Sequence, residues 1–333
     1  MRPHKTILVV GAGRFGRNYL SVLDQMTRNP AKGSRRVGTL ILSRTDANAA
    51  RTQARALADT PGSAFASVVG EAIANVHQLE QALNKHQPDL VCITARDRQI
   101  GDDIHVAYAQ TALSCCAVLC EKPLSRAGQG RAGLKKAMAL AEHPRAECFG
   151  LELPMAVVRN KMLADRHLGH LMRSAKGIAF FWEKLSEQGD LINDLALHPW
   201  SLLPADRQIR VEAVSGNSRS VDIRLSLHDD EKWPLDLPCH IHLSTGSAFR
   251  GMQLDDHLFQ FHFEAGSLQV LAHPKRRRIE PRRQIDIASA KPVLIVNNPL
   301  ARHIEASLKG APLVDIHETL RSQAFLEALH AHA

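Results

Sequence analysis

Three glycines near the amino terminus have the spacing of a phosphate-binding turn. Gly11, Gly13 and Gly16 follow an apolar, β-branched run over residues 6–10 and precede a helix-compatible segment over residues 17–26. In such a unit the first glycine permits a tight turn, the second lets a pyrophosphate approach the backbone, and the third lets the helix pack on the strand. The sequence therefore predicts dinucleotide binding, against the alternative of a purely structural turn. The candidate contacts are Gly11, Gly13, Arg14, Phe15 and Gly16.

A second candidate contact with the cofactor follows the apolar strand predicted over residues 37–42. Ser43 and Arg44 occupy the place where an acidic residue would bind the ribose 2′-hydroxyl of NAD. A hydroxyl and a guanidinium suit a 2′-phosphate, because arginine presents several fixed donors to phosphate oxygens. We therefore predict NADP as the cofactor. NAD stays possible, because Asp46 lies close by in the sequence and Arg44 could instead stack on the adenine or point into solvent.

Strand-like and helix-like segments alternate through the first 150 residues. The helix-like ranges are 53–58, 71–85 and 102–114, and the strand-like ranges are 89–94 and 117–120. This alternation predicts βαβ units on a parallel sheet, which binds ligands beyond the carboxyl ends of its strands. Glu121, Lys122 and Pro123 directly follow a predicted strand. We therefore place Glu121 and Lys122 at the rim of the cofactor cleft.

The pattern changes near residue 150. Short strand-like segments follow, joined mostly by turns, over residues 174–182, 211–227, 240–245, 257–264, 267–271 and 293–296. Such a series predicts a mainly antiparallel sheet with one solvated face. The expected fold class is α/β plus α+β. A Rossmann domain with a doubly wound parallel sheet is expected over residues 1–150, and an α+β domain over residues 151–333.

Length and composition indicate a globular protein of about two domains. The 333 residues are 44% hydrophobic and 23% charged, with a formal net charge of +8. No run approaches the roughly 18 apolar residues that span a bilayer, and the first residues pass straight into a strand-like run. We therefore expect a cytoplasmic protein without membrane contact. The histidines and cysteines show no metal-ligand spacing, so no metal is expected.

Residues 275–283 contain a dense basic run, and such runs can form phosphate-binding patches. It lies between two predicted strands, and no recognised DNA- or RNA-binding module surrounds it. We interpret it as a solvated hairpin tip and expect no nucleic-acid partner. A contact with an anionic substrate or with another subunit is the alternative.

Four features together resemble one enzyme family. They are the glycine turn, the Glu121-Lys122-Pro123 tripeptide, the segment from Asp194 to His198 about 70 residues later, and a helix-like ending over residues 315–329. This combination resembles the glucose-fructose oxidoreductase, inositol dehydrogenase and rhizopine-catabolism (Gfo/Idh/MocA) family of NAD(P)-dependent oxidoreductases. In that family the lysine contacts the nicotinamide ribose and substrate, and the aspartate and histidine flank the reacting carbon. The resemblance implies Lys122, Asp194 and His198 as catalytic residues.

The chemistry of these side chains suits hydride transfer to or from a secondary alcohol carbon, which requires a proton to leave or join the oxygen. Histidine exchanges protons near neutral pH, and lysine can hydrogen-bond the oxygen as negative charge develops. Asp194 could bind a substrate hydroxyl or orient the His198 imidazole. Pro199 disfavours helical geometry at His198, so a helical face shared with Asp194 depends on the local structure.

The sequence departs from the family pattern at two places. Ala196 replaces the central glycine between Asp194 and His198. The family commonly has a Thr-Pro-Asn turn with a histidine a few residues later, whereas here Thr94 begins a longer, more charged segment and His105 follows eleven positions on. We keep Thr94 as a cofactor contact. The charged residues of the longer segment are expected either to shape the nicotinamide pocket or to reach the substrate, and they are Arg96, Asp97, Arg98, Asp102 and Asp103.

These observations predict an NADP(H)-preferring oxidoreductase that transfers a hydride to or from a secondary alcohol or ketone carbon of a small polar, sugar-like substrate. Two alternatives stay open: a reductase of imines or double bonds on the same fold, and a non-catalytic NADP-binding sensor. In the resembled family the antiparallel sheet forms the floor of the substrate site and an oligomer interface. We therefore expect a homodimer or homotetramer.

Overall fold

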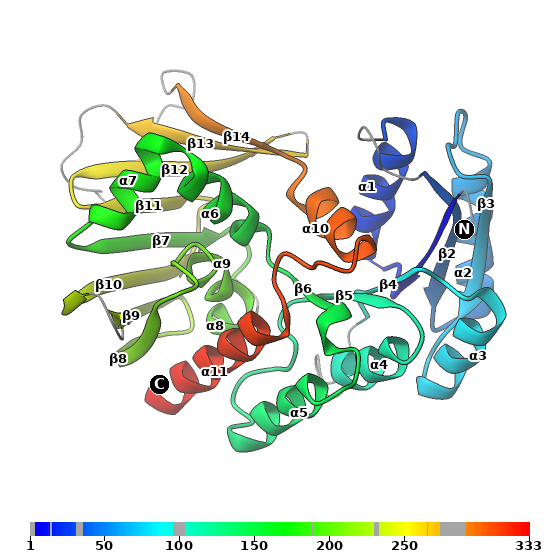
Figure 1. The fold of residues 1–333 in the computed structure, drawn as a ribbon, viewed down its shortest axis with the longest axis horizontal. Helices are drawn as coiled ribbons and strands as arrows, with labels where there is room; N and C mark the ends of the chain where they lie inside the picture. The colour runs from blue at the N-terminus through cyan, green and yellow to red at the C-terminus, as the bar shows by residue number, and fades with distance from the viewer. Residues whose placement is uncertain are drawn as a thin grey trace. The chain divides into compact units, whose positions relative to one another are not determined.

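A computed structural model of the chain describes residues 4–13, 15–30, 36–95, 104–187, 189–229, 233–264, 266–273 and 291–333 (Figure 1). The chain forms two compact units. The parallel-sheet unit comprises Met1–Glu152 and Leu300–Gln323, and the mixed-sheet unit comprises Leu153–Pro299 and Ala324–Ala333. The first boundary lies within two residues of the expected one, whereas the return of residues 300–323 to the first unit differs from the expected division.

The parallel-sheet unit is built on six strands in the order β3-β2-β1-β4-β5-β6, and every neighbouring pair is parallel. The strands are β1 (Lys5–Val10), β2 (Val37–Arg44), β3 (Ser67–Ala72), β4 (Leu90–Ile93), β5 (Ala117–Glu121) and β6 (Phe149–Glu152). All residues of β4 and β5 are buried, as in strands covered on both faces. The order reverses between β1 and β4, the point at which doubly wound sheets bind ligands. The predicted Rossmann sheet is confirmed.

The helices of this unit are α1 (Gly16–Arg28), α2 (Ala47–Ala58), α3 (Val76–His86), α4 (Ile104–Leu113), α5 (Arg131–Ala141), α10 (Pro299–Leu308) and the first part of α11 (Ile316–His332), and η1 (Ala146–Cys148) is a short 3-10 turn. The side chains of Asp46 and Asn75 cap α2 and α3. The helix predicted over residues 71–85 is wrong at its start. Its first residues complete β3, where the β-branched Val68 and Val69 pair with β2.

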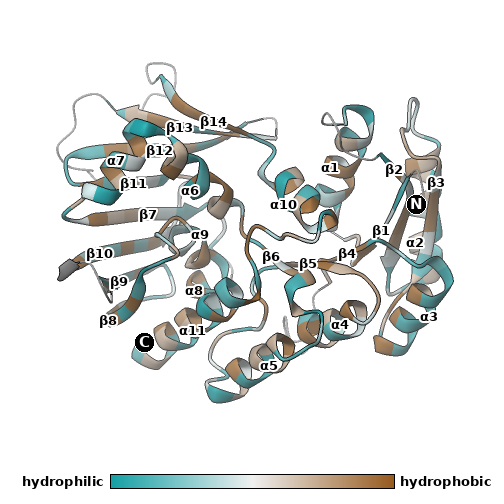
Figure 2. Cartoon of the chain, in the orientation of Figure 1, coloured by the Kyte–Doolittle hydropathy of each residue, from teal (hydrophilic) through white to brown (hydrophobic). Residues whose placement is uncertain are grey.

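The core of the parallel-sheet unit lies between the sheet and its helices. Ile7, Leu40 and Leu90 from three strands are fully buried, as is Leu23 of α1. Ile304 of α10 is buried in the same cluster, which explains why the return segment belongs to this unit. Figure 2 shows hydrophobic residues along the strands and mixed polar and apolar surfaces on the helices.

The mixed-sheet unit contains eight strands in the order β14-β13-β12-β11-β7-β10-β9-β8. They are β7 (Ile178–Lys184), β8 (Gln208–Asn217), β9 (Ser220–Asp229), β10 (Trp233–Thr245), β11 (Arg250–Leu254), β12 (His257–Glu264), β13 (Ser267–His273) and β14 (Pro292–Asn297). Only the β7–β10 pair is parallel among the described strand pairs. The predicted, mainly antiparallel sheet is confirmed. The single strand predicted over residues 211–227 is instead a hairpin, whose turn is held by the Asn217 side chain.

Four helices lie on one face of this sheet: α6 (Pro154–Ala164), α7 (Arg166–Ser174), α8 (Leu191–Leu195) and α9 (Leu197–Trp200) (Figure 1). Along β10, Ile241 and Leu243 are fully buried, whereas His240 and His242 are partly exposed. This alternation is that of a sheet with one covered and one open face.

Candidate active site

The glycine turn connects the end of β1 to the start of α1. Gly11 has a φ of +91°, and a Cβ atom there would lie 2.5 Å from the Cα of Ala95. A Cβ on Gly16 would lie 2.6 Å from the carbonyl oxygen of Gly11. Contacts within the protein itself therefore require glycine at both positions.

Gly13 has a different environment. The nearest heavy atom to a Cβ built there is the Gly11 carbonyl oxygen, 3.9 Å away, so the described residues leave this side of the turn open. An open backbone at a helix N-terminus is what an incoming pyrophosphate requires. The turn therefore fits a dinucleotide. Phe15 is 41% exposed beside it, and the candidate Arg14 lies outside the described residues.

Ser43 and Thr94 brace this turn from the neighbouring strand ends. The Gly11 N–H donates to the Ser43 hydroxyl at 3.3 Å, and the Ala12 N–H donates to the Ser43 carbonyl at 2.8 Å. The Thr94 hydroxyl donates to the Gly11 carbonyl at 2.8 Å. Both side chains are buried. These contacts give Ser43 and Thr94 a structural role in shaping the turn.

Arg44 ends β2 and is half-buried. Its Nη1 donates to Gln53 Oε1 at 3.3 Å, and Gln53 Nε2 donates to the Ala12 carbonyl at 3.0 Å. Asp46 is occupied differently, since its carboxylate accepts the Ala49 N–H at 2.6 Å and caps α2. The guanidinium is thereby tied to the glycine turn through Gln53, a residue for which the sequence carries no recognisable signal.

Glu121, Lys122 and Glu152 form a buried charged cluster at the ends of β5 and β6. Glu121 and Glu152 are directly paired in register, so their side chains lie on the same face of the sheet. The three residues are 6%, 8% and 9% exposed. Burial and, second, the charge of Glu121 raise the pKa of Glu152 to about 8, although Lys122 opposes the shift. Glu152 is therefore mostly protonated at neutral pH.

Tyr19 of α1 and His105 of α4 border this cluster. Burial, followed by the charges of Glu152 and Glu121, raises the pKa of Tyr19 well above its ordinary value. His105 is fully buried, and its Nδ1 lies 2.9 Å from the Pro123 carbonyl oxygen. His105 thus supports the backbone beside Lys122. Residues 96–103, which we expected to shape the pocket, lie outside the described residues.

Asp194 belongs to the mixed-sheet unit, where it pairs with Lys184. Lys184 Nζ and Asp194 Oδ2 are 2.5 Å apart, and the lysine side chain is only 14% exposed. A Cβ on Gly189, whose φ is +97°, would lie 2.5 Å from the same carboxylate oxygen. The backbone at Gly189 thus passes close against the ion pair. The sequence does not indicate Lys184 as a site residue, because no sequence pattern shows which residue pairs with a lysine at the end of a strand.

His198 lies in α9 of the same unit. Its ring stacks on Trp182 of β7, with centroids 5.7 Å apart and planes inclined by 12°. The expectation that Pro199 disfavours a helix here is wrong. Proline is tolerated in the first turn of a helix, where its missing N–H would have no partner in the helix, and α9 begins only two residues earlier. The helical segment is interrupted at Ala196, which separates α8 with Asp194 from α9 with His198.

Residues 5–149 match the model of an oxidoreductase family with an NAD-binding Rossmann fold. The matching model is that of the Gfo/Idh/MocA family. The chain is accordingly an oxidoreductase with a nicotinamide cofactor. No curated protein matches the sequence.

Solved structures share this fold of the Gfo/Idh/MocA family over the full length. UDP-N-acetylglucosamine 3-dehydrogenase from Acidithiobacillus ferrooxidans is 16% identical, with a TM-score of 0.62 and 99% of each chain covered. An NAD-binding oxidoreductase from Klebsiella pneumoniae is 13% identical, with a TM-score of 0.63 over 99% of this chain and 96% of that chain. Levoglucosan dehydrogenase in complex with NADH is 12% identical, with a TM-score of 0.62 over 99% and 98%. At these identities the likeness shows the fold.

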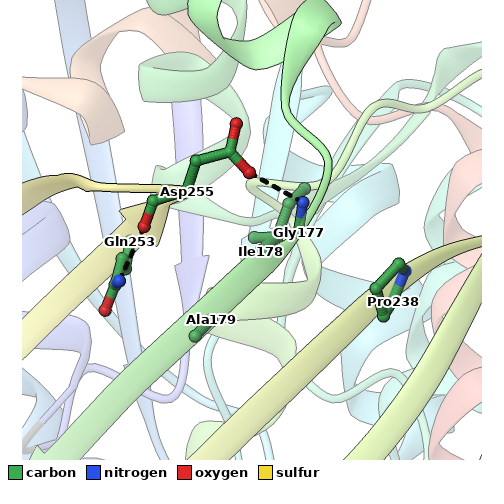
Figure 3. Close-up of a pocket in the computed structure, with 6 residues that line it drawn as sticks. All are labelled: Gly177, Ile178, Ala179, Pro238, Gln253 and Asp255. Atoms are coloured by element: carbon green, nitrogen blue, oxygen red, sulfur yellow. Dashed lines mark hydrogen bonds between the residues drawn. The ribbon is translucent and has the colours of Figure 1, made fainter. Parts of the chain in front are cut away.

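A pocket of about 280 Å³ in the mixed-sheet unit is lined by Gly177, Ile178, Ala179, Pro238, Gln253 and Asp255 (Figure 3). One carboxylate oxygen of Asp255 accepts hydrogen bonds from the N–H groups of Lys176 and Gly177. Within the described residues, no helix combines the length and apolar character of a membrane span.

Proposed function

We propose that the chain is an NADP(H)-preferring oxidoreductase that acts on a secondary alcohol or ketone carbon of a small sugar-like substrate. The cofactor preference is supported by the different hydrogen bonds of Arg44, the last residue of β2, and Asp46, which follows this strand. Arg44 is held beside the glycine turn through Gln53, whereas Asp46 is occupied as the cap of α2. A guanidinium in this place favours a 2′-phosphate, whereas one carboxylate oxygen of Asp46 already accepts the Ala49 N–H.

Reaction at the substrate is assigned to three side chains. In such enzymes a nicotinamide cofactor supplies the hydride donor or acceptor. Lys122 hydrogen-bonds the substrate oxygen as negative charge develops there, and His198 takes up or returns the proton of that oxygen. Asp194 binds a substrate hydroxyl, with its carboxylate oriented by Lys184. Because Glu152 is mostly neutral at neutral pH, it adds little negative charge to the buried cluster that contains Lys122.

The proposed substrate class rests on the resemblance and on the structural neighbours. Two of these neighbours are named for the oxidation of a nucleotide sugar and of an anhydrosugar. A neutral polyol or sugar suits the proposed roles, because each of its ring hydroxyls can accept from lysine or donate to a carboxylate. The proposal also includes assembly as a homodimer or homotetramer and a cytoplasmic location. Analytical ultracentrifugation tests the oligomeric state.

Replacing Arg44 tests the cofactor preference. We expect Arg44→Ala to weaken NADPH binding by about 10- to 100-fold, because hydrogen bonds between charged groups contribute about 1.5–3 kcal/mol, and to leave NADH binding within twofold. Arg51→Ala, which removes an exposed cation from the same stretch, serves as the charge-matched control. Fluorescence titration of reduced cofactors measures both affinities. An NADPH-to-NADH ratio that Arg44→Ala leaves unchanged contradicts the preference.

A screen of polyols, sugar acids, keto compounds and imines tests the reaction. Absorbance at 340 nm reports turnover, and Lys122→Ala is expected to lower kcat by at least about 100-fold when it is assayed at saturating cofactor. Turnover only with imines or activated double bonds would favour the reductase alternative. Tight NADP binding without turnover of any compound would favour the sensor.

A further inference from the structure

The side chain of Gln53 makes two hydrogen bonds, one as a donor and one as an acceptor. It sits on α2 and is partly buried. Its amide N–H donates to the Ala12 carbonyl in the glycine turn at 3.0 Å, and its amide oxygen accepts from Arg44 Nη1 at 3.3 Å. One side chain therefore connects the turn to the guanidinium.

The chemistry of an amide is suited to this connection. An arginine that bonds a carboxylate has its charge compensated, and that carboxylate repels an approaching phosphate. The glutamine oxygen orients the guanidinium and carries no charge, so the full positive charge is kept for an anion. The nearby carboxylate of Asp46 accepts the Ala49 N–H instead.

The amide also fixes the guanidinium relative to the backbone of the turn. Because Ala12 lies between Gly11 and Gly13, any anion bound at the turn is near the point to which Gln53 is anchored. The remaining N–H groups of the guanidinium can donate to phosphate oxygens, since arginine has five donors in a rigid fork.

We propose that Gln53 is a positioning residue for cofactor selection, which holds the Arg44 guanidinium against the glycine turn so that the two bind a 2′-phosphorylated dinucleotide together. This inference rests on the NADP preference proposed above. Gln53 acts through Arg44, so its contribution exists only for the phosphorylated cofactor.

The test compares binding of NADPH and NADH to the full-length chain and four variants: Gln53→Leu, Gln53→Glu, Arg44→Ala, and Arg44→Ala combined with Gln53→Leu. Gln81→Leu, on the exposed face of α3, is the matched control. Gln53→Leu removes both hydrogen bonds, and we expect the loss of the bond to Arg44 to weaken NADPH binding by about 5- to 10-fold. NADH binding should stay within twofold, because Ser43 and Thr94 also hold the turn. Gln53→Glu should lose more, because its carboxylate compensates Arg44 and repels phosphate.

The double variant separates positioning from a merely structural role. If Gln53 acts through Arg44, adding Gln53→Leu to Arg44→Ala changes the NADPH-to-NADH ratio by less than about twofold. Equal losses for both cofactors in Gln53→Leu would overturn the inference, since Gln53 would then only brace the turn. If Gln53→Leu does not fold, the NADPH-to-NADH affinity ratio of Gln53→Glu provides the test of the role of Gln53.

Failure of the two proposals can be told apart. A ratio lowered by Arg44→Ala but unchanged in both Gln53 variants overturns the role of Gln53 alone. A ratio unchanged in Arg44→Ala overturns the NADP preference, and the role of Gln53 with it.

Discussion

At the scale of single residues, Glu152 makes stability depend on pH. Its pKa lies near 8 in the folded chain because of burial and the adjacent Glu121, whereas an exposed glutamate titrates near pH 4.3. Between these values the folded chain binds about one proton more than the unfolded chain. The free energy of unfolding must therefore fall, through this group, as pH rises from about 4.5 to about 8.

Substituting Glu152 by glutamine should remove this dependence. Because one pKa unit corresponds to about 1.4 kcal/mol, we expect Glu152→Gln to gain on the order of 4 kcal/mol relative to the original chain between pH 5 and pH 9. Urea unfolding at a series of pH values measures the difference. Glu142→Gln, at an exposed position, should follow the original chain. A Glu152→Gln curve parallel to the original one would contradict the buried-carboxyl explanation.

At the scale of elements, the turn between β1 and α1 separates two kinds of glycine. Gly16→Ala places a methyl group against the Gly11 carbonyl, 2.6 Å away, and should cost about 1–3 kcal/mol of stability.

Gly13→Ala meets no heavy atom closer than 3.9 Å and should leave the thermal midpoint nearly unchanged. Its methyl group occupies the open side of the turn, so NADPH and NADH should both bind at least about tenfold more weakly. Calorimetry and cofactor titration of the two variants distinguish these effects, and undiminished affinity in Gly13→Ala would refute the cofactor role of the turn.

At the scale of the whole molecule, the parallel-sheet unit is completed by a segment nearly 150 residues away in sequence. Ile304 of α10 is fully buried in its core. We expect Ile304→Ala to lower the free energy of unfolding by about 2–5 kcal/mol, whereas Arg302→Ala, an exposed change on the same helix, should have little effect. Urea denaturation provides the comparison. Equal stabilities of the two variants would show that α10 contributes nothing to this core.

The parallel sheet could be predicted because its signals are local. Apolar strands directly precede Gly11 and Glu121, and the alternation of strand and helix leaves few topologies. Strand β3 was not predicted, because Val68 and Val69 form an apolar run too short to be distinguished from the following helix. The place of α10 was not predicted either, because no local signal indicates which core a helix late in the chain will join.

The candidate site was predictable only in part. Motif spacing points to the glycine turn, Arg44 and Lys122. The partners Gln53 and Lys184 could not be foreseen, because a hydrogen bond between residues 41 positions apart or an ion pair at a strand end is created by tertiary packing. The same holds for Glu152, whose pairing with Glu121 depends on the register of two strands. The catalytic roles of Lys122, Asp194 and His198 stay predictions.

The brace formed by Ser43 and Thr94 has a thermodynamic consequence. A loop already fastened to its neighbours through Gly11 and Ala12 has little conformational entropy left to lose when a nucleotide arrives. The protein incurs that loss during folding, once, and each later cycle of nucleotide uptake and release avoids it.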